Sequence, residues 1–140
     1  PRKGARPTTP EEPAPPPAAT KSGGSTAKLI ADGQAALRRG SPSEAASHFR
    51  KAVGRAPGNA AAHAGLGQAE FQQGRNGVAA RHFGRAVKLR PGSVRYRLLY
   101  GGVLMRLGHR SEARREYEAA LRMDPDNAMA QRRLKRLGGG

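Results

Sequence analysis

The sequence predicts an all-α solenoid of three helix-turn-helix repeats and a terminal helix, because one pattern recurs at a fixed interval. Pro57, Pro91 and Pro125 stand 34 residues apart. Each proline closes the same run of alanine, an aromatic residue and alanine at the same offsets: Ala45, Phe49, Ala52; Ala79, Phe83, Ala86; and Ala113, Tyr117, Ala120. A chain that repeats a unit of this length stacks the units, so that each covers the apolar face of its neighbour. Such an array exposes an extended surface suited to binding.

The first 24 residues differ in composition from the rest of the chain. They hold seven of the eleven prolines and no large apolar residue. Such a segment cannot bury enough apolar surface to offset the entropy lost on ordering. We therefore expect residues 1–24 to be a disordered, Pro-rich linker and residues 25–140 to form the folded domain. Because the chain begins with Pro1 rather than Met, we also expect it to be a piece of a longer polypeptide.

From Ser25 onward apolar residues recur three and four positions apart, which is the period of an amphipathic helix. The expected helices pair as 26–39 with 42–56, 60–73 with 76–89, and 94–107 with 111–123. The repeats then cover 26–59, 60–93 and 94–127. A capping helix at 128–137 follows, with Met129, Leu134 and Leu137 on its apolar face. We expect this helix to cover the open edge of the last repeat.

The expected helix boundaries follow the same 34-residue interval. The side-chain oxygen of Ser or Asn accepts an unpaired backbone N–H at a helix start, and four such residues fit: Ser25, Asn59, Ser93 and Asn127. Glycine ends a helix where φ is positive, and three glycines fit: Gly40, Gly74 and Gly108. The run Ser41-Pro42-Ser43-Glu44 predicts a capping box with proline at the first helical position.

Composition restricts the possible partners and compartments. The 26 Lys and Arg against 10 Asp and Glu give a net charge of +16, which predicts acidic partners such as protein, nucleic acid or anionic lipid. Most of this charge lies on the expected second helices and the last helix, which fits either a solvated exterior or a docking surface. The chain has no cysteine, which excludes disulfides and thiolate chemistry. No apolar run approaches the roughly 18 residues that span a bilayer. We expect a cytoplasmic protein, and the bias toward Arg, Ala, Gly and Pro is typical of a GC-rich bacterial genome.

Catalytic and metal chemistry have little support in the sequence. His48 and His82 occupy equivalent positions and can face each other on adjacent second helices, but a zinc site needs further ligands. No Ser or Thr lies in a nucleophile elbow. The run from Gly74 to Gly77 lacks the Lys and Ser or Thr of a phosphate-binding loop. We therefore expect no enzyme activity, no metal and no cofactor.

The repeat unit resembles the tetratricopeptide repeat family, whose pattern has Leu-Gly early in the first helix and Ala-x3-Phe followed by Pro in the second. The early pair reads Asp32-Gly33, Leu66-Gly67 and Tyr100-Gly101, so the small residue that lets two helices approach is kept in every copy. The resemblance covers residues 25–140. It implies a right-handed superhelix whose concave groove, lined mainly by the first helices, takes a peptide segment of a partner protein.

The groove positions of the family predict a binding surface in this chain. Glutamines at these positions can hydrogen-bond a bound backbone, and the arginines favour acidic residues that flank the ligand. Chaperone-binding members hold a carboxylate with a clamp of basic residues, of which only Arg95 is kept here. Ile30, Leu98 and Leu99 fit either inter-repeat packing or ligand contact. The predicted surface is Gln34, Arg38, Gln68, Phe71, Gln72, Arg95, Leu98, Met105 and Arg106.

Two functions follow from these observations. The first is an adaptor or scaffold domain, monomeric on its own, that binds a segment of another protein. The alternative is electrostatic binding of nucleic acid or an anionic membrane through the Arg-rich helices. Nucleic-acid binding normally interleaves stacking aromatics with basic residues, whereas Phe49, Phe83 and Tyr117 occupy expected core positions. We therefore expect a protein partner rather than nucleic acid or a membrane.

Overall fold

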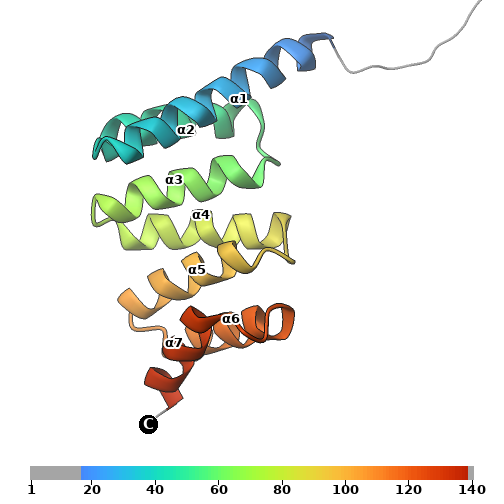
Figure 1. Ribbon diagram of the computed structural model, residues 1–140. Coiled ribbons are helices and arrows are strands. Elements are labelled where there is room, and N and C mark those ends of the chain that lie inside the picture. The colour runs from blue at the N-terminus through green and yellow to red at the C-terminus, as the bar shows by residue number, and fades with distance from the viewer. Residues whose placement is uncertain (1–16, 139–140) are drawn as a thin grey trace, which may run out of the picture.

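The computed structural model describes the backbone of residues 17–138 and the side chains of residues 25–138. In this range the chain forms helices and no strands, and the helices stack as hairpins in chain order (Figure 1). Each helix packs against the next one along the chain. The predicted all-α solenoid is therefore confirmed. The helices are α1 Pro17–Arg38, α2 Pro42–Arg55, α3 Ala60–Gln72, α4 Asn76–Leu89, α5 Val94–Arg106, α6 Arg110–Met123 and α7 Ala128–Gly138.

The start of α1 differs from the prediction. The helix begins at Pro17, so Ser25 lies inside it, and the expected N-cap at Ser25 is wrong. Proline is tolerated in the first turn because its missing N–H would have no helical partner there. Gly23 and Gly24 each disfavour a helix by about 1 kcal/mol, but they do not end it. Residues 17–24 of the expected linker thus belong to α1, and residues 1–16 lie outside the described part of the chain.

The other three predicted N-caps are confirmed. Asn59 accepts the backbone N–H of Ala62 at 3.1 Å, and Ser93 accepts that of Tyr96 at 3.1 Å. Asn127 starts α7 in the same way, with 2.9 Å between its side-chain oxygen and the nitrogen of Ala130. Each bond satisfies one backbone donor that the helix itself leaves unpaired.

A second contact at each of these helix starts was not predicted. The side chain four residues after the cap donates an N–H to the carbonyl of the proline two residues before it. The three pairs are His63 Nε2 with Pro57 at 2.8 Å, Arg97 Nε with Pro91 at 2.9 Å, and Gln131 Nε2 with Pro125 at 2.9 Å. Because a carbonyl only accepts hydrogen bonds, this position needs a side-chain N–H donor, and three different residue types supply it.

The turns inside the hairpins are partly as predicted. Gly40, Gly74 and Gly108 have φ of 80°, 82° and 83°, the region that glycine enters without steric cost. The capping box at Ser41 is wrong, because the side chain of Ser41 makes no capping bond. Its backbone N–H already donates to Ala36, so Glu44 finds no free donor there and pairs with Arg39 at 2.9 Å.

The repeated aromatic position forms the core of each hairpin. Phe49, Phe83 and Tyr117 are at most 2 % exposed. The glycine of the early pair in each repeat lies against these rings: a Cβ at Gly33, Gly67 or Gly101 would come within 2.7–2.8 Å of a ring atom. These glycines therefore allow the two helices of a hairpin to approach, as the sequence predicted. No helix of the described range is long and apolar enough to cross a membrane.

Candidate functional site

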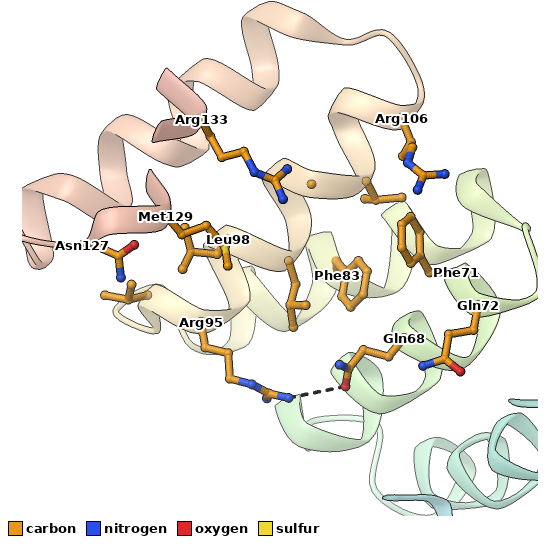
Figure 2. Close-up of a pocket in the computed structure, with 14 residues that line it drawn as sticks. Gln68, Phe71, Gln72, Phe83, Arg95, Leu98, Arg106, Asn127, Met129 and Arg133 are labelled. Atoms are coloured by element: carbon orange, nitrogen blue, oxygen red, sulfur yellow. Dashed lines mark hydrogen bonds between the residues drawn. The ribbon is translucent and has the colours of Figure 1, made fainter. Parts of the chain in front are cut away.

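A pocket of about 800 Å³ opens between α3, α5 and α7 (Figure 2). Its volume lies within the range of about 300–1,000 Å³ that is usual for ligand sites. We call it the α3–α5–α7 pocket. The lining comprises Gln68, Phe71 and Gln72 of α3; Phe83 of α4; Val94, Arg95, Leu98, Leu99, Gly102, Val103 and Arg106 of α5; and Asn127, Met129 and Arg133 at the start of α7 and within it.

The pocket exists because α5 carries larger side chains than the corresponding face of α3. Gly65 on α3 lies directly against the ring of Phe49, and α1 and α3 are in contact. The residue 34 positions later is Leu99, which packs beside the next core ring, Phe83. A leucine side chain thus stands where Gly65 has only a hydrogen atom, and α5 contacts α3 less closely than α3 contacts α1. The opening that results is bounded on its far side by α7.

The floor of the α3–α5–α7 pocket is apolar and its edges are cationic. Phe71, Leu98 and Leu99 are half-buried there, and Met129 is 43 % exposed. The ionic side chains in the lining are those of Arg95, Arg106 and Arg133, and in the described part of the chain no aspartate or glutamate lines the pocket. The site can therefore hold an apolar group and anionic groups together.

The three arginines make weak contacts within the protein. Arg95 Nη2 donates to Gln68 Oε1 at 3.4 Å, and Arg133 Nη1 donates to Tyr117 Oη at 3.5 Å. Arg106 lies 5.3 Å from the centre of the Phe71 ring, within the range of a cation–π contact. Burial raises the pKa of Tyr117, and the charge and hydrogen bond of Arg133 partly oppose this. Among residues 25–138 no ion pair involves these three arginines, so their charges remain available to a ligand.

The structure brings six of the nine predicted site residues together: Gln68, Phe71, Gln72, Arg95, Leu98 and Arg106 line the pocket. Gln34 and Arg38 are exposed on α1 and lie outside it. Met105 packs instead into the core around Leu104 and Tyr117. Ile30 packs into the core around Phe49, whereas Leu98 and Leu99 line the pocket. Ligand contact by any of these residues stays a prediction.

Residues of the last helix were missed, because α7 was assigned only a covering role. Met129 was placed on the packed face with Leu134 and Leu137, yet it is exposed while Leu137 is buried. At 3.6 residues per turn, Met129 and Leu134 point about 140° apart, so the sequence already held a signal that Met129 faces elsewhere. Arg133 had no comparable signal, since its role depends on how α7 crosses α5.

A second polar cluster lies outside the pocket, where α2, α3 and α4 meet. Glu70 is buried, and its two carboxylate oxygens each lie 3.1 Å from an arginine, Arg50 or Arg75. His82 was expected to face His48, but its Nδ1 instead lies 3.4 Å from Nδ1 of His63 on the same hairpin. Burial and the neighbouring His63 lower the pKa of His82. Within the described residues no three His, Cys, Asp or Glu side chains gather as a metal site.

Comparison with known proteins agrees with this architecture. Two family models, each described as tetratricopeptide repeat, match residues 30–94 and 70–137. No curated protein matches the sequence.

Three solved structures with similar folds contain bound peptides. The first TPR domain of Spaghetti (RPAP3), bound to the HSP90 peptide SRMEEVD, is 23 % identical with a TM-score of 0.79, over 82 % of this chain and 91 % of that one. The second TPR domain of human RPAP3, in complex with the HSP70 peptide SGPTIEEVD, is 18 % identical with a TM-score of 0.79, over 84 % and 98 %. The Yersinia enterocolitica type III secretion chaperone SycD, in complex with a peptide of the translocator YopD, is 14 % identical with a TM-score of 0.74, over 79 % and 90 %.

These likenesses concern the fold, and the family models concern the sequence itself. Together the two models span residues 30–137. The chain therefore belongs to the tetratricopeptide repeat family.

Proposed function

We propose that the chain is a non-catalytic interaction module that binds a segment of a partner protein in the α3–α5–α7 pocket. The observation that carries this proposal is the pocket itself. It is large enough for a ligand, its floor of Phe71, Leu98 and Leu99 is apolar, and polar groups converge at its edges. Ligand sites combine these features. Within a larger protein such a module acts as an adaptor or scaffold.

The chemistry of the lining and the relatives support a peptide as the ligand. The side-chain amides of Gln68 and Gln72 each offer a donor and an acceptor, which suits the backbone of an extended segment. Three structural relatives hold peptides in their own structures. Arg95, Arg106 and Arg133 favour a segment with acidic flanks. A cytoplasmic location and a monomeric state stay predictions.

A glycine in the pocket allows a sharp test. A Cβ at Gly102 would meet no atom within 4 Å, so Gly102→Leu fills the pocket without disturbing the core. Leucine also favours a helix over glycine by about 1 kcal/mol, so the variant should stay folded. Gly54 on α2 is exposed and equally open, which makes Gly54→Leu the matched control. The tagged wild-type chain and both variants would be used to recover partners from cell extract, with thermal melting as the check on folding.

We expect the wild type and Gly54→Leu to recover the same proteins and Gly102→Leu to lose them. If Gly102→Leu keeps its partners, binding does not use the pocket and the proposal is wrong. Binding at the basic exterior would then be tested by salt. Counterion release weakens nucleic-acid binding by roughly 10³ to 10⁵ between 50 and 200 mM salt for about six to ten phosphate contacts.

A further inference from the structure

The charges of the α3–α5–α7 pocket are divided between two edges. Figure 2 shows Arg106 and Arg133 along the upper edge and Arg95 along the lower edge, with Phe71, Phe83 and Leu98 between them. Arg106 comes from the end of α5, Arg133 from α7 and Arg95 from the start of α5. A ligand that satisfies all three must carry anionic groups at both ends and an apolar group in the middle.

The spacing of these charges is set by α5. Arg95 and Arg106 are eleven residues apart on this helix, and at 1.5 Å per residue their Cα atoms are about 16 Å apart. An extended peptide advances about 3.3 Å per residue. About five residues of an extended segment therefore span the distance between the two cationic edges.

The middle of the pocket is uncovered apolar surface. Met129 is 43 % exposed, whereas Leu137 of the same helix is 3 % exposed and Leu134 packs against the core around Tyr117. It faces the pocket together with Leu98 of α5 and Phe71 of α3. A large apolar side chain of a ligand would remove all three from water, and the gain grows with the apolar area buried.

We propose that the partner segment carries two acidic groups about five residues apart with one large aliphatic or aromatic side chain between them. This inference rests on the proposed function and names the ligand class of the same site. Carboxylates at one end meet Arg106 and Arg133, and a carboxylate at the other end meets Arg95, through charge-assisted hydrogen bonds. The apolar side chain contacts Phe71, Leu98 and Met129. Basic segments are excluded, because they would bring like charges against three unpaired arginines.

A library of random twelve-residue peptides displayed on phage tests the ligand class. The library would be selected on the whole chain and, in parallel, on Gly102→Leu. We expect the wild type to enrich peptides with Asp or Glu on both sides of a Leu, Ile, Met or Phe, and the variant to enrich none of them. Enrichment of neutral or basic peptides would overturn this inference and leave the proposed function standing. Absence of any enrichment over Gly102→Leu would overturn both.

A designed peptide then tests the spacing and the residues. The probe is fluorescein-labelled Gly-Glu-Asp-Ser-Leu-Ser-Glu-Asp-Gly, in which equivalent acids are five residues apart. Its controls replace leucine with serine, replace all four acids with their amides, or place the two acidic pairs side by side. We expect each control peptide to bind the wild-type chain more weakly than the probe in fluorescence anisotropy. Equal binding of the side-by-side peptide would refute the spacing.

Matched substitutions identify the pocket. Arg106→Gln and Arg133→Gln should each weaken binding of the probe roughly threefold to tenfold, as expected for one charge-assisted bond at a partly exposed site. Arg115→Gln, an exposed α6 arginine outside the lining, removes the same charge and should leave binding unchanged. Met129→Ala should weaken binding, whereas Met123→Ala, at a similarly exposed methionine, should not. If all arginine variants lose affinity equally, the attraction is a general effect of net charge and the inference is wrong.

Discussion

Two inter-repeat seams of this solenoid share one backbone pattern but are packed differently. The first seam joins the α1–α2 hairpin to α3 around Phe49, and the second joins the α3–α4 hairpin to α5 around Phe83. At the first seam Gly65 and Ala69 lie close to the core ring. Their equivalents at the second seam are Leu99 and Val103. The first seam is filled by its ring, while the second leaves the α3–α5–α7 pocket.

The comparison shows which properties of the repeat are the same at both seams and which differ between them. The caps, the positive-φ glycines and the aromatic core position are common to both seams and fix the backbone. The volume of a few side chains on the first helix then decides whether adjacent helices touch or stand apart. The two seams therefore differ in free space although they share one fold.

Placing the leucine of the second seam at the equivalent position of the first seam gives the largest expected effect on stability. Gly65→Leu places the residue of the second seam into the first. Even a Cβ at Gly65 would lie well inside 3.0 Å of the Phe49 ring, and that ring is fully buried. Overpacking usually costs about 1–3 kcal/mol, and we expect the free energy of unfolding to fall by more than about 3 kcal/mol. Urea unfolding followed by circular dichroism measures the loss.

The control for this exchange is Gly102→Leu, which adds the same side chain to open space at the second seam. Its free energy of unfolding should not fall. An equal loss of unfolding free energy in the two variants would show that leucine is unfavourable at both positions, and that the seams do not differ in free space.

Shortening the side chain of Leu99, at the second seam, has a smaller expected effect on stability. Leu99 is half-buried and packs between the cores around Phe83 and Tyr96. We expect Leu99→Ala to lower the free energy of unfolding by about 2 kcal/mol, the lower end of the range for leucine in a core. Leu99→Met keeps the volume and should cost less than about 1.5 kcal/mol. If Leu99→Ala is neutral in urea unfolding, Leu99 does not support the second seam.

The N-caps are common to both seams, so their removal should lower stability equally at each. Asn59→Ala and Ser93→Ala each remove one side-chain cap, and we expect each to lower the free energy of unfolding by about 1 kcal/mol. The exchanges Asn59→Ser and Ser93→Asn should be nearly neutral, because both residues cap well. A loss of stability in only one of the two alanine variants, measured in the same urea series, would contradict the idea that the N-caps play the same role at both seams.

These shared features are what sequence could predict. Helix ends, N-caps at Asn59, Ser93 and Asn127, and the glycines with positive φ depend on residues a few positions apart, and the 34-residue interval repeats that local chemistry. Six residues of the pocket were predicted from the groove positions that the resemblance to the repeat family implies, on the first helices of the second and third repeats. Local patterns thus predicted the helix boundaries, and the resemblance predicted six of the 14 lining residues.

The other pocket residues depend on contacts between helices that the repeat pattern does not predict. Arg133 and Met129 reach the pocket only because α7 folds back beside α5. The family's groove positions also predict Gln34 and Arg38, but these lie exposed on α1 and do not line the pocket. His63 meets His82 because the two lie opposite each other on one hairpin, whereas the sequence comparison matched only equivalent positions.

That histidine pair distinguishes the second repeat from the third, where the equivalent residues Arg97 and Glu116 form an ion pair at 3.0 Å. His63 Nε2 lies 2.8 Å from the carbonyl of Pro57, which can only accept, so this nitrogen carries the hydrogen. Nδ1 of neutral His63 is then an acceptor, and Nδ1 of His82 donates to it across 3.4 Å. A further proton on His82 would place a positive charge at a half-buried position beside His63.

The folded chain should therefore bind fewer protons than the unfolded chain in mild acid. Burial first, then the charge of His63, lowers the pKa of His82 below its ordinary value of 6.5; Arg81 and Arg50 add to this and Glu70 opposes it. Stability should thus be constant above the unfolded pKa and fall as the pH drops below 6.5. Because His82 is only half-buried, solvent screening makes this the smallest of the four effects.

Urea unfolding of the wild type at pH 7.5 and at lower pH measures the slope, and His82→Gln identifies its source. The glutamine amide can still donate to His63 but does not titrate, so the variant should lose stability less steeply in acid. A His82→Gln variant with an unchanged slope would show that His82 accepts a proton as freely as in the unfolded chain, and that it is not the source of the slope.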